Sequence, residues 1–136
     1  MAGFLTDYTN NKVLDLIFGS SSFIAPATLY FGLSSSPSSK GGGGISEPSV
    51  GGYSRAILGN SSINFPAATA GTKTNSTLIV FPAPTADWGL MQSLFVSDAA
   101  MGGNIIAMAD LSAPRLIKSG SAAPTVAIGA LFLSHT

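Results

Sequence analysis

Residues 87–107 have the sequence DWGLMQSLFVSDAAMGGNIIA, and this stretch decides the fold. Two apolar runs, 90–97 and 105–111, flank residues 97–104, where Asp, Gly and Asn supply the conformations that a chain reversal needs. The pattern predicts a β-hairpin with a loop longer than two residues. Trp88 begins the first strand, where a tryptophan is typically a core or interface anchor. A sugar-stacking platform, as in lectins, is the alternative for this side chain.

Outward from the hairpin, short runs rich in β-formers recur between turn residues. Their regular spacing predicts a mainly β chain, a compact antiparallel sandwich or barrel-like domain. Two proline-containing joints, 81–84 and 112–115, are predicted to end strands. The further strands are predicted at 28–33, 53–58, 62–65, 77–81 and 125–133.

One segment near the N-terminus predicts a helix over residues 6–18. Thr6 is a suitable N-cap, Asp7 lies in the first turn where the helix dipole favours an acid, and Gly19 follows the last turn. The apolar residues at 13–18 make a broad stripe. We therefore expect this helix to lie across the sheet with much of its surface covered.

Residues 34–52 form a long stretch of mostly Ser, Gly and Pro, including four consecutive glycines at 41–44. This composition is typical of a flexible loop, and loops of this length are usually functional or disordered. Two interpretations stay open, a solvent-exposed loop and an arm that becomes ordered against a neighbouring chain. Because the segment cannot build a core of its own, we expect any order in it to come from a neighbour.

Composition indicates a part of an assembly. Only 9% of the 136 residues are charged, the formal net charge is +0, and there is no cysteine; soluble domains usually carry about a quarter charged residues. Near-zero charge favours association. The length suits one domain, residues 1–136. Scattered Lys and Arg argue against nucleic-acid binding, no basic-then-apolar leader is visible, and no apolar run is long enough for a membrane helix.

The side chains that perform catalysis are scarce. His135 is the single histidine, and no G-x-S-x-G motif accompanies it. The carboxylates are spread along the chain, and we expect Asp87 and Asp98 to cap turns. The glycine run at 41–44 lacks the Lys-Ser/Thr that a phosphate loop requires. We therefore predict no enzyme activity and no catalytic, cofactor-binding or metal-binding residue.

Three ordered segments resemble a family of short virion proteins of tailed bacteriophages, often labelled tail-fibre or minor structural proteins. Residues 5–19 resemble that family's N-terminal helix. Gly51-Gly52-Tyr53-Ser54-Arg55 is similar to its G-G-x-Y/Y-x-R segment, and residues 85–104 are similar to its central hairpin. The resemblance implies a structural protein located in the virion, and it carries no catalytic residues.

Two functions are compatible with this resemblance. We expect a capsid decoration (cement) protein, a homo-oligomeric clamp on the phage head that contacts the major capsid protein, because the chain has no heptads and no shaft repeat. The alternative is a tail-associated or tail-fibre protein, bound to other tail proteins, that binds a host glycan receptor. Copy number per virion distinguishes them, with hundreds indicating the head and a handful the tail.

Overall fold

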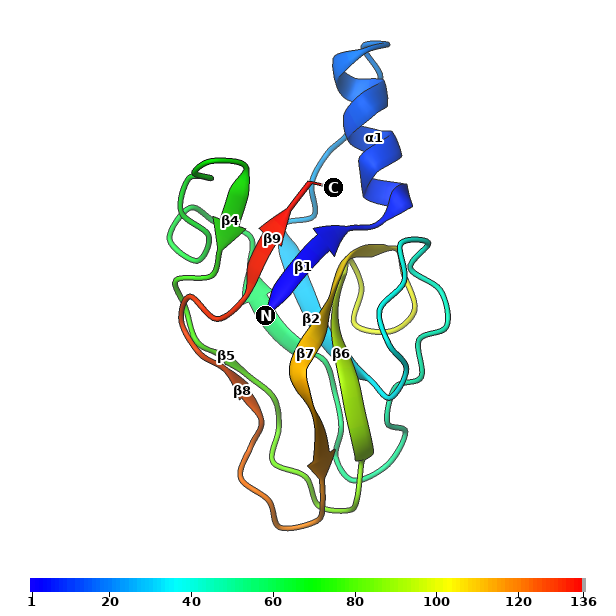
Figure 1. Cartoon of the computed structure of the whole chain (residues 1–136), viewed down its shortest axis with the longest axis vertical. Helices are drawn as coiled ribbons and strands as arrows, with labels where there is room; N and C mark the ends of the chain where they lie inside the picture. The colour runs from blue at the N-terminus through cyan, green and yellow to red at the C-terminus, as the bar shows by residue number, and fades with distance from the viewer. Residues whose placement is uncertain (136) are drawn as a thin grey trace.

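A seven-stranded sheet in the order β3-β2-β6-β7-β1-β9-β4 forms the body of the protein, and β5 and β8 form a second, two-stranded sheet. The computed structural model describes residues 1–135 (Figure 1). The elements in chain order are β1 (Ala2–Leu5), α1 (Asp7–Ile17), β2 (Thr28–Ser34), β3 (Ala56–Gly59), β4 (Thr72–Thr74), β5 (Ile79–Val80), β6 (Gly89–Ser97), β7 (Ile105–Ile117), β8 (Thr125–Val126) and β9 (Phe132–Ser134).

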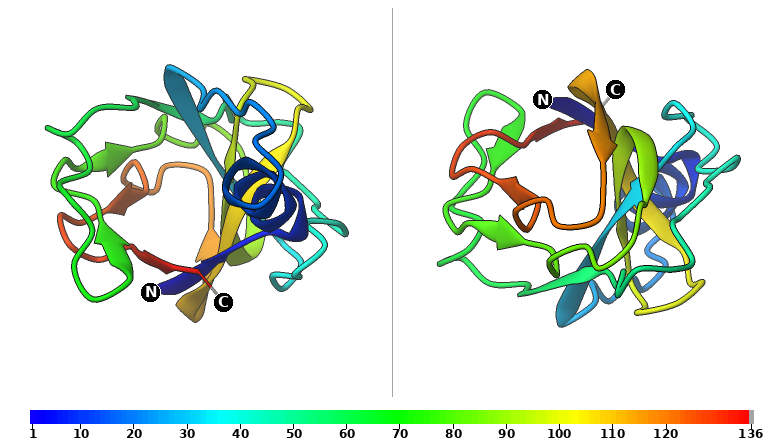
Figure 2. Two further views of the ribbon diagram at one scale, coloured as in Figure 1. Left: turned by 90° about the horizontal axis from the view of Figure 1, so that it is seen from above. Right: turned by 90° about the horizontal axis from the view of Figure 1, so that it is seen from below.

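The large sheet curls into a half-barrel, as the views along the long axis show (Figure 2). β1 pairs in parallel with β9, and the other pairs are antiparallel. This confirms the predicted β sandwich or barrel-like domain with an N-terminal helix. The single-domain assignment of residues 1–136 stays a prediction.

Alternate side chains of the central strands fill the concave side of the sheet, because successive strand residues point to opposite faces. Phe31 and Leu33 of β2 lie beside Leu94 and Val96 of β6 in one buried cluster. Ile79 of the small sheet joins the same cluster and is buried. The small sheet therefore shares the core of the half-barrel.

The predicted hairpin is confirmed, but its second strand is longer than expected. β7 continues to Ile117, so residues 112–115 do not end a strand. Met91 pairs with Arg115 and Ser93 pairs with Asp110, which leaves residues 111–114 in a bulge. Pro114 is tolerated because bulged residues do not donate to the ladder. At the other proline joint β5 does end, at Val80.

Several strand boundaries differ from the sequence prediction. Residues 62–65 are not a strand, because the amide of Phe65 and the side chain of Ser61 close a turn there. Residues 125–133 make two strands, β8 and β9. They are separated by a turn in which Gly129 has φ +76°, a left-handed conformation that favours glycine. β1 and β4 were not predicted.

The predicted helix forms, but its expected position was wrong. α1 is tied to β7 only near its start, where the hydroxyl groups of Thr6 and Thr9 donate to the carbonyls of Ile105 (2.5 Å) and Ile106 (2.8 Å). Thr6 is at the N-cap position without making a side-chain cap. The rest of the helix projects beyond the end of the sheet, so its surface is largely uncovered (Figure 1).

Candidate functional site

A stack of three residues on the convex side of the sheet supports the candidate site. Phe95 of β6 is fully buried, yet it lies outside the main core cluster. Its ring covers the backbone of Gly32 on β2 so closely that a Cβ there would lie 2.1 Å from Phe95 Cζ. The guanidinium of Arg55 lies over the same ring, 4.9 Å from its centroid. The missing side chain at position 32 therefore makes room for the aromatic ring that carries Arg55.

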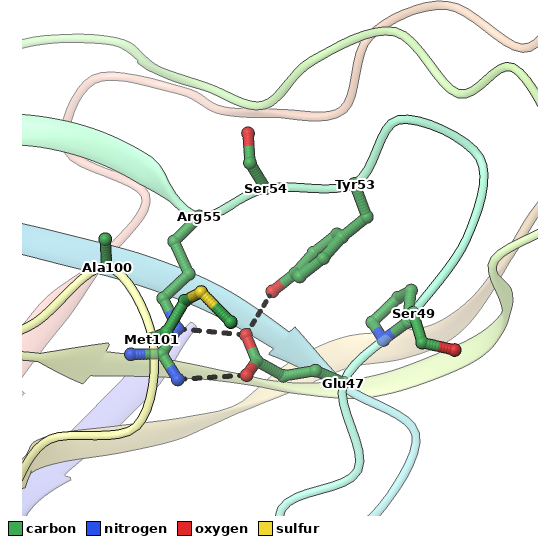
Figure 3. Close-up of a pocket in the computed structure, with 8 residues that line it drawn as sticks. Glu47, Ser49, Tyr53, Ser54, Arg55, Ala100 and Met101 are labelled. Atoms are coloured by element: carbon green, nitrogen blue, oxygen red, sulfur yellow. Dashed lines mark hydrogen bonds and ion pairs between the residues drawn. The ribbon is translucent and has the colours of Figure 1, made fainter.

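Arg55 joins this stack to two loops. An ion pair with Glu47 joins it to the segment 34–52, and hydrogen bonds to backbone carbonyls join it to the hairpin loop (Figure 3). Its Nε donates to Glu47 Oε1 at 3.0 Å and its Nη2 to Oε2 at 2.9 Å. Its Nη1 donates to the carbonyls of Ala99 (2.6 Å) and Gly102 (2.9 Å) in the hairpin loop. The side chains are 4% and 27% exposed, so the arginine is covered and the glutamate borders solvent. Glu47, Tyr53 and Arg55 are called the latch below.

Tyr53 connects the latch to the sheet and to the indole of Trp88. Its hydroxyl donates to Glu47 Oε1 at 2.8 Å and accepts from the amide of Leu33 at 3.0 Å. The rings of Tyr53 and Trp88 meet edge to face with centroids 5.2 Å apart. Trp88 Nε1 donates to the carbonyl of Gly51 at 3.0 Å, and the indole is buried. Trp88 is therefore a core anchor and not a sugar-stacking platform, because a buried indole has no face open to a sugar.

The latch fixes the protonation states of its members. Burial alone would raise the pKa of Glu47, but the hydrogen bonds from Arg55 and Tyr53 outweigh it and hold this pKa below its ordinary value of 4.5. Burial raises the pKa of Tyr53, and the neighbouring Glu47 adds to that rise. At neutral pH the site therefore holds a carboxylate, a guanidinium and a protonated phenol, whose charges sum to zero.

Beside the latch lies an open pocket of about 470 Å³. The exposed residues Ser49 and Ser54 border it, with the Ser54 hydroxyl on the side of the backbone opposite to Tyr53 and Arg55, and Met101 lines it from the hairpin loop (Figure 3). Pro48 and Ala100 complete its apolar lining. The pocket thus combines one ionised acceptor, neutral hydroxyls and small apolar surfaces.

The segment 34–52 is held by its own chain at several points. The amide of Ser46 donates to Ser34 Oγ at 3.0 Å, and the amide of Ser38 donates to Asp110 at 2.8 Å. The carbonyl of Lys40 accepts from the amide of Asp7 at 2.8 Å, at the start of α1. The expectation that order here must come from a neighbouring chain was wrong, since these contacts and the latch are internal. The flexibility of the segment stays a prediction.

The structure does not bring the other candidate residues together. Asp98 accepts from the amide of Asn104 at 2.8 Å and so caps its own loop as expected. Asp87 accepts from the amide of Ser119, 32 residues away, at 2.8 Å, so it ties two distant segments together and does not cap its own turn. His135 is exposed beyond β9. Within residues 1–135, no three His, Cys, Asp or Glu side chains gather as a metal site. The absence of metal, cofactor and catalytic residues stays a prediction.

Sequence reasoning did not identify the latch as a site. The segment 51–55 was noted only as a family anchor, and Glu47 only as one of several dispersed carboxylates. One signal was available, namely a single acid inside a Ser/Gly-rich loop shortly before a tyrosine and an arginine two residues apart. The carboxylate of Glu47 must be either solvated or paired with a positive charge, and Arg55 is the next basic residue along the chain.

Comparison with known proteins links the whole arrangement to one family. The model of the family described as Gp80, podophage GP4 fiber I protein gp80, matches residues 4–134. No curated protein matches the chain. None of the helices within residues 1–135 is long and apolar enough to cross a membrane.

Proposed function

The chain belongs to the podophage GP4 fiber I protein gp80 family, and from this membership we propose that it is a structural component of a phage tail fibre. The observation that supports this is the extent of the match. Residues 4–134 include α1, nearly all of the curled sheet and the latch, so the resemblance is to a whole fold and not to one motif. The fibre-type structural role and the virion location follow from the family.

The family description favours the tail over the head. It names a fibre protein, and nothing in the comparisons supports the capsid decoration role or a contact with the major capsid protein. The lack of a shaft repeat, which pointed to the head, is compatible with a short fibre part that attaches to other tail proteins. We therefore favour the tail-fibre alternative.

The role proposed is non-enzymatic, because four of the six acids bind groups of the chain itself. Glu47 pairs with Arg55, and Asp87, Asp98 and Asp110 accept hydrogen bonds from the amides of Ser119, Asn104 and Ser38. General acid–base chemistry at a glycosidic bond needs two carboxyl groups facing across a cleft. The pocket beside the latch is lined by one carboxylate.

We further propose that this pocket is the point of contact with a glycan on the host surface. Its charges cancel within the Arg55–Glu47 pair, so it suits a neutral ligand better than an anion. Each carboxylate oxygen has two lone pairs, and the three hydrogen bonds that Glu47 accepts leave acceptor capacity for a hydroxyl group. Ser49, Ser54 and the apolar surfaces of Pro48 and Met101 match the mixed polarity of a sugar ring.

Copy number tests the structural proposal. Quantitative mass spectrometry of purified virions, scaled to the major capsid protein, should give a handful of copies per particle. Hundreds of copies would overturn the tail assignment and favour head decoration.

Pocket filling tests the glycan contact. Ala100→Trp adds bulk at an exposed residue that lines the pocket, and Ala113→Trp adds the same bulk at an exposed position in the β7 bulge. Binding of the purified chain to polysaccharide extracted from host cells should be lost in A100W and kept in A113W. Equal binding by both variants, or no binding by the wild type, would refute the glycan contact while leaving the structural role intact.

A further inference from the structure

Lys73 lies on the core-facing side of an edge strand. β4 is the last strand of the seven-stranded sheet (Figure 1), and Lys73 pairs there with Leu133 of β9. Side chains directly opposite each other in an antiparallel pair share one face of the sheet. Leu133 packs against the core cluster, so the half-buried Lys73 is on the same side as the core. Its charged group requires water or a partner, because burying an unpaired charge is costly.

The chain itself does not supply that partner. Within residues 1–135, no acid forms an ion pair with Lys73 and no acceptor hydrogen-bonds to its ammonium group. Lys73 lines two open pockets of about 310 and 240 Å³, and the residues that line them include no acid. His135, which lines the smaller pocket, is a residue type that is neutral or positively charged. The surroundings of Lys73 therefore favour a negatively charged ligand.

Protection of the sheet edge does not account for this lysine. Charged side chains, lysine above all, commonly prevent exposed edge strands from pairing with other chains. The outer edge of β4 is already covered by its own chain, since Thr69 and Thr72 exchange both backbone hydrogen bonds, at 2.9 and 3.0 Å. The positive charge of Lys73 is therefore available to a ligand.

We propose that the larger of the two pockets, called the Lys73 pocket, binds the acidic group of a sugar, a carboxylate or a phosphate, at the ammonium group of Lys73. The pocket is lined by Asn60, Ser61, Ser62, Phe65, Ala67 and Lys73. A hydrogen bond from an ammonium group to an oxyanion is roughly twice as strong as one between neutral groups. Ligand pockets start at about 300 Å³, so this volume suits one sugar unit better than a longer chain.

The other residues of the Lys73 pocket suit the neutral part of such a sugar. Asn60 donates from Nδ2 to the carbonyl of Pro26 at 2.8 Å, which leaves its Oδ1 to accept from a sugar hydroxyl. Ser61 Oγ accepts from the amide of Asn64 at 3.3 Å, which leaves the hydroxyl hydrogen to donate. Phe65 and Ala67 add apolar surface for the ring carbons.

The Lys73 pocket differs from the pocket beside the latch in its charge. The two pockets share no residue. In the latch the charge of Arg55 is cancelled by Glu47, whereas the charge of Lys73 is not cancelled by any acid within residues 1–135. The inference therefore goes beyond the glycan contact proposed above and does not depend on it.

An NMR titration of the backbone amides of the full chain tests the proposal. Glucuronate and glucose 6-phosphate are the acidic probes, and glucose is the neutral control. At least one acid should shift the amides of residues 60–62 and 73, and the acid that does so identifies the group as a carboxylate or a phosphate. Glucose should not. The proposal is overturned if neither acid shifts these amides, if glucose shifts them equally, or if the shifts are confined to residues 47–55 and 100–101 of the latch pocket.

Lys73→Met keeps the apolar stem and removes the charge. Because a hydrogen bond to a charged group is lost, K73M should bind the acid about tenfold more weakly or worse. Lys118→Met is the matched control, since Lys118 is exposed and lines neither pocket, and it should bind as the wild type does. Wild-type affinity in K73M, or an equal loss in K118M, would contradict the assignment.

Salt dependence gives a second readout on the unaltered chain. Added sodium chloride screens the attraction between charges, so it should weaken binding of the acid to the wild type. An affinity that does not change with salt would also overturn the proposal.

Discussion

Removing Arg55 should loosen two loops at once. Arg55→Met keeps much of the apolar stem but removes the ion pair with Glu47 and the bonds to the carbonyls of Ala99 and Gly102. Removing one partner of a buried pair costs about 3–5 kcal/mol. Glu47 keeps its bond from Tyr53 and some contact with solvent, so we expect about 3 kcal/mol, at the lower end of that range. For a chain of this length the loss lowers Tm by about 10 °C.

Urea and thermal denaturation, followed by circular dichroism, measure this loss. Arg115→Met is the matched control, because Arg115 is exposed and its loss should change the free energy of unfolding by no more than about 0.5 kcal/mol. Amide hydrogen exchange should rise in residues 34–52 and 98–104 of R55M and stay unchanged in R115M. If R55M is as stable as R115M, or if these loops exchange no faster, the latch does not hold them and the reasoning is refuted.

Three further predictions concern single positions. Glu47→Gln should destabilise the protein most at neutral pH. Because the folded pKa of Glu47 is below 4.5, the gap in unfolding free energy from wild type should close as the pH falls below that value in urea titrations, and a pH-independent gap would contradict it. Gly32→Ala should cost about 3 kcal/mol by overpacking, whereas Gly59→Ala, with no neighbour closer than 3.7 Å, should cost less than about 1 kcal/mol, and equal losses would refute the close approach. Asn75→Ala leaves the buried amide of Leu131 without its 3.1 Å bond and should cost about 2–3 kcal/mol in the same assay; an unchanged midpoint would show that the turn holds without it.

The sequence predicted the secondary structure of those segments whose own residue pattern determines it. The hairpin 87–107 and the helix have strong periodic or turn signals, and both form. Position in space did not follow from these signals. The apolar side of α1 predicts a buried face. In the structure only the first turns of the helix contact the sheet, and the apolar side chains near its C-terminal end are exposed. A pattern shows that a face is apolar, and it does not show which surface covers it.

Pairing between distant segments was beyond prediction for the same reason. β1 and β4 are four and three residues long and acquire their strand conformation from β9, which lies far along the chain from both. β7 continues past Pro114 because this residue lies in a bulge, where its missing N–H is not needed for pairing. The bulge is defined by the register with the partner strand β6, which the local sequence does not show.

The latch shows why the candidate site could not be predicted from the sequence. Each member looked ordinary in sequence, since Glu47 is in a loop and Arg55 precedes a short strand. Their meeting depends on Gly32 leaving room for Phe95, a relation across two strands that no single segment encodes. The internal contacts of residues 34–52 were missed for this reason, because Asp110 and Arg55, which make them, lie outside the segment.

The position of the protein in the virion tests the central claim most directly. A cryo-EM reconstruction of whole particles that resolves the capsid lattice and the tail, with the curled sheet and projecting helix as the shape to be fitted, decides between the two locations. The structural account predicts that this shape fits density on the tail in a handful of copies. Density for the chain repeated over the capsid lattice, with none on the tail, would contradict it.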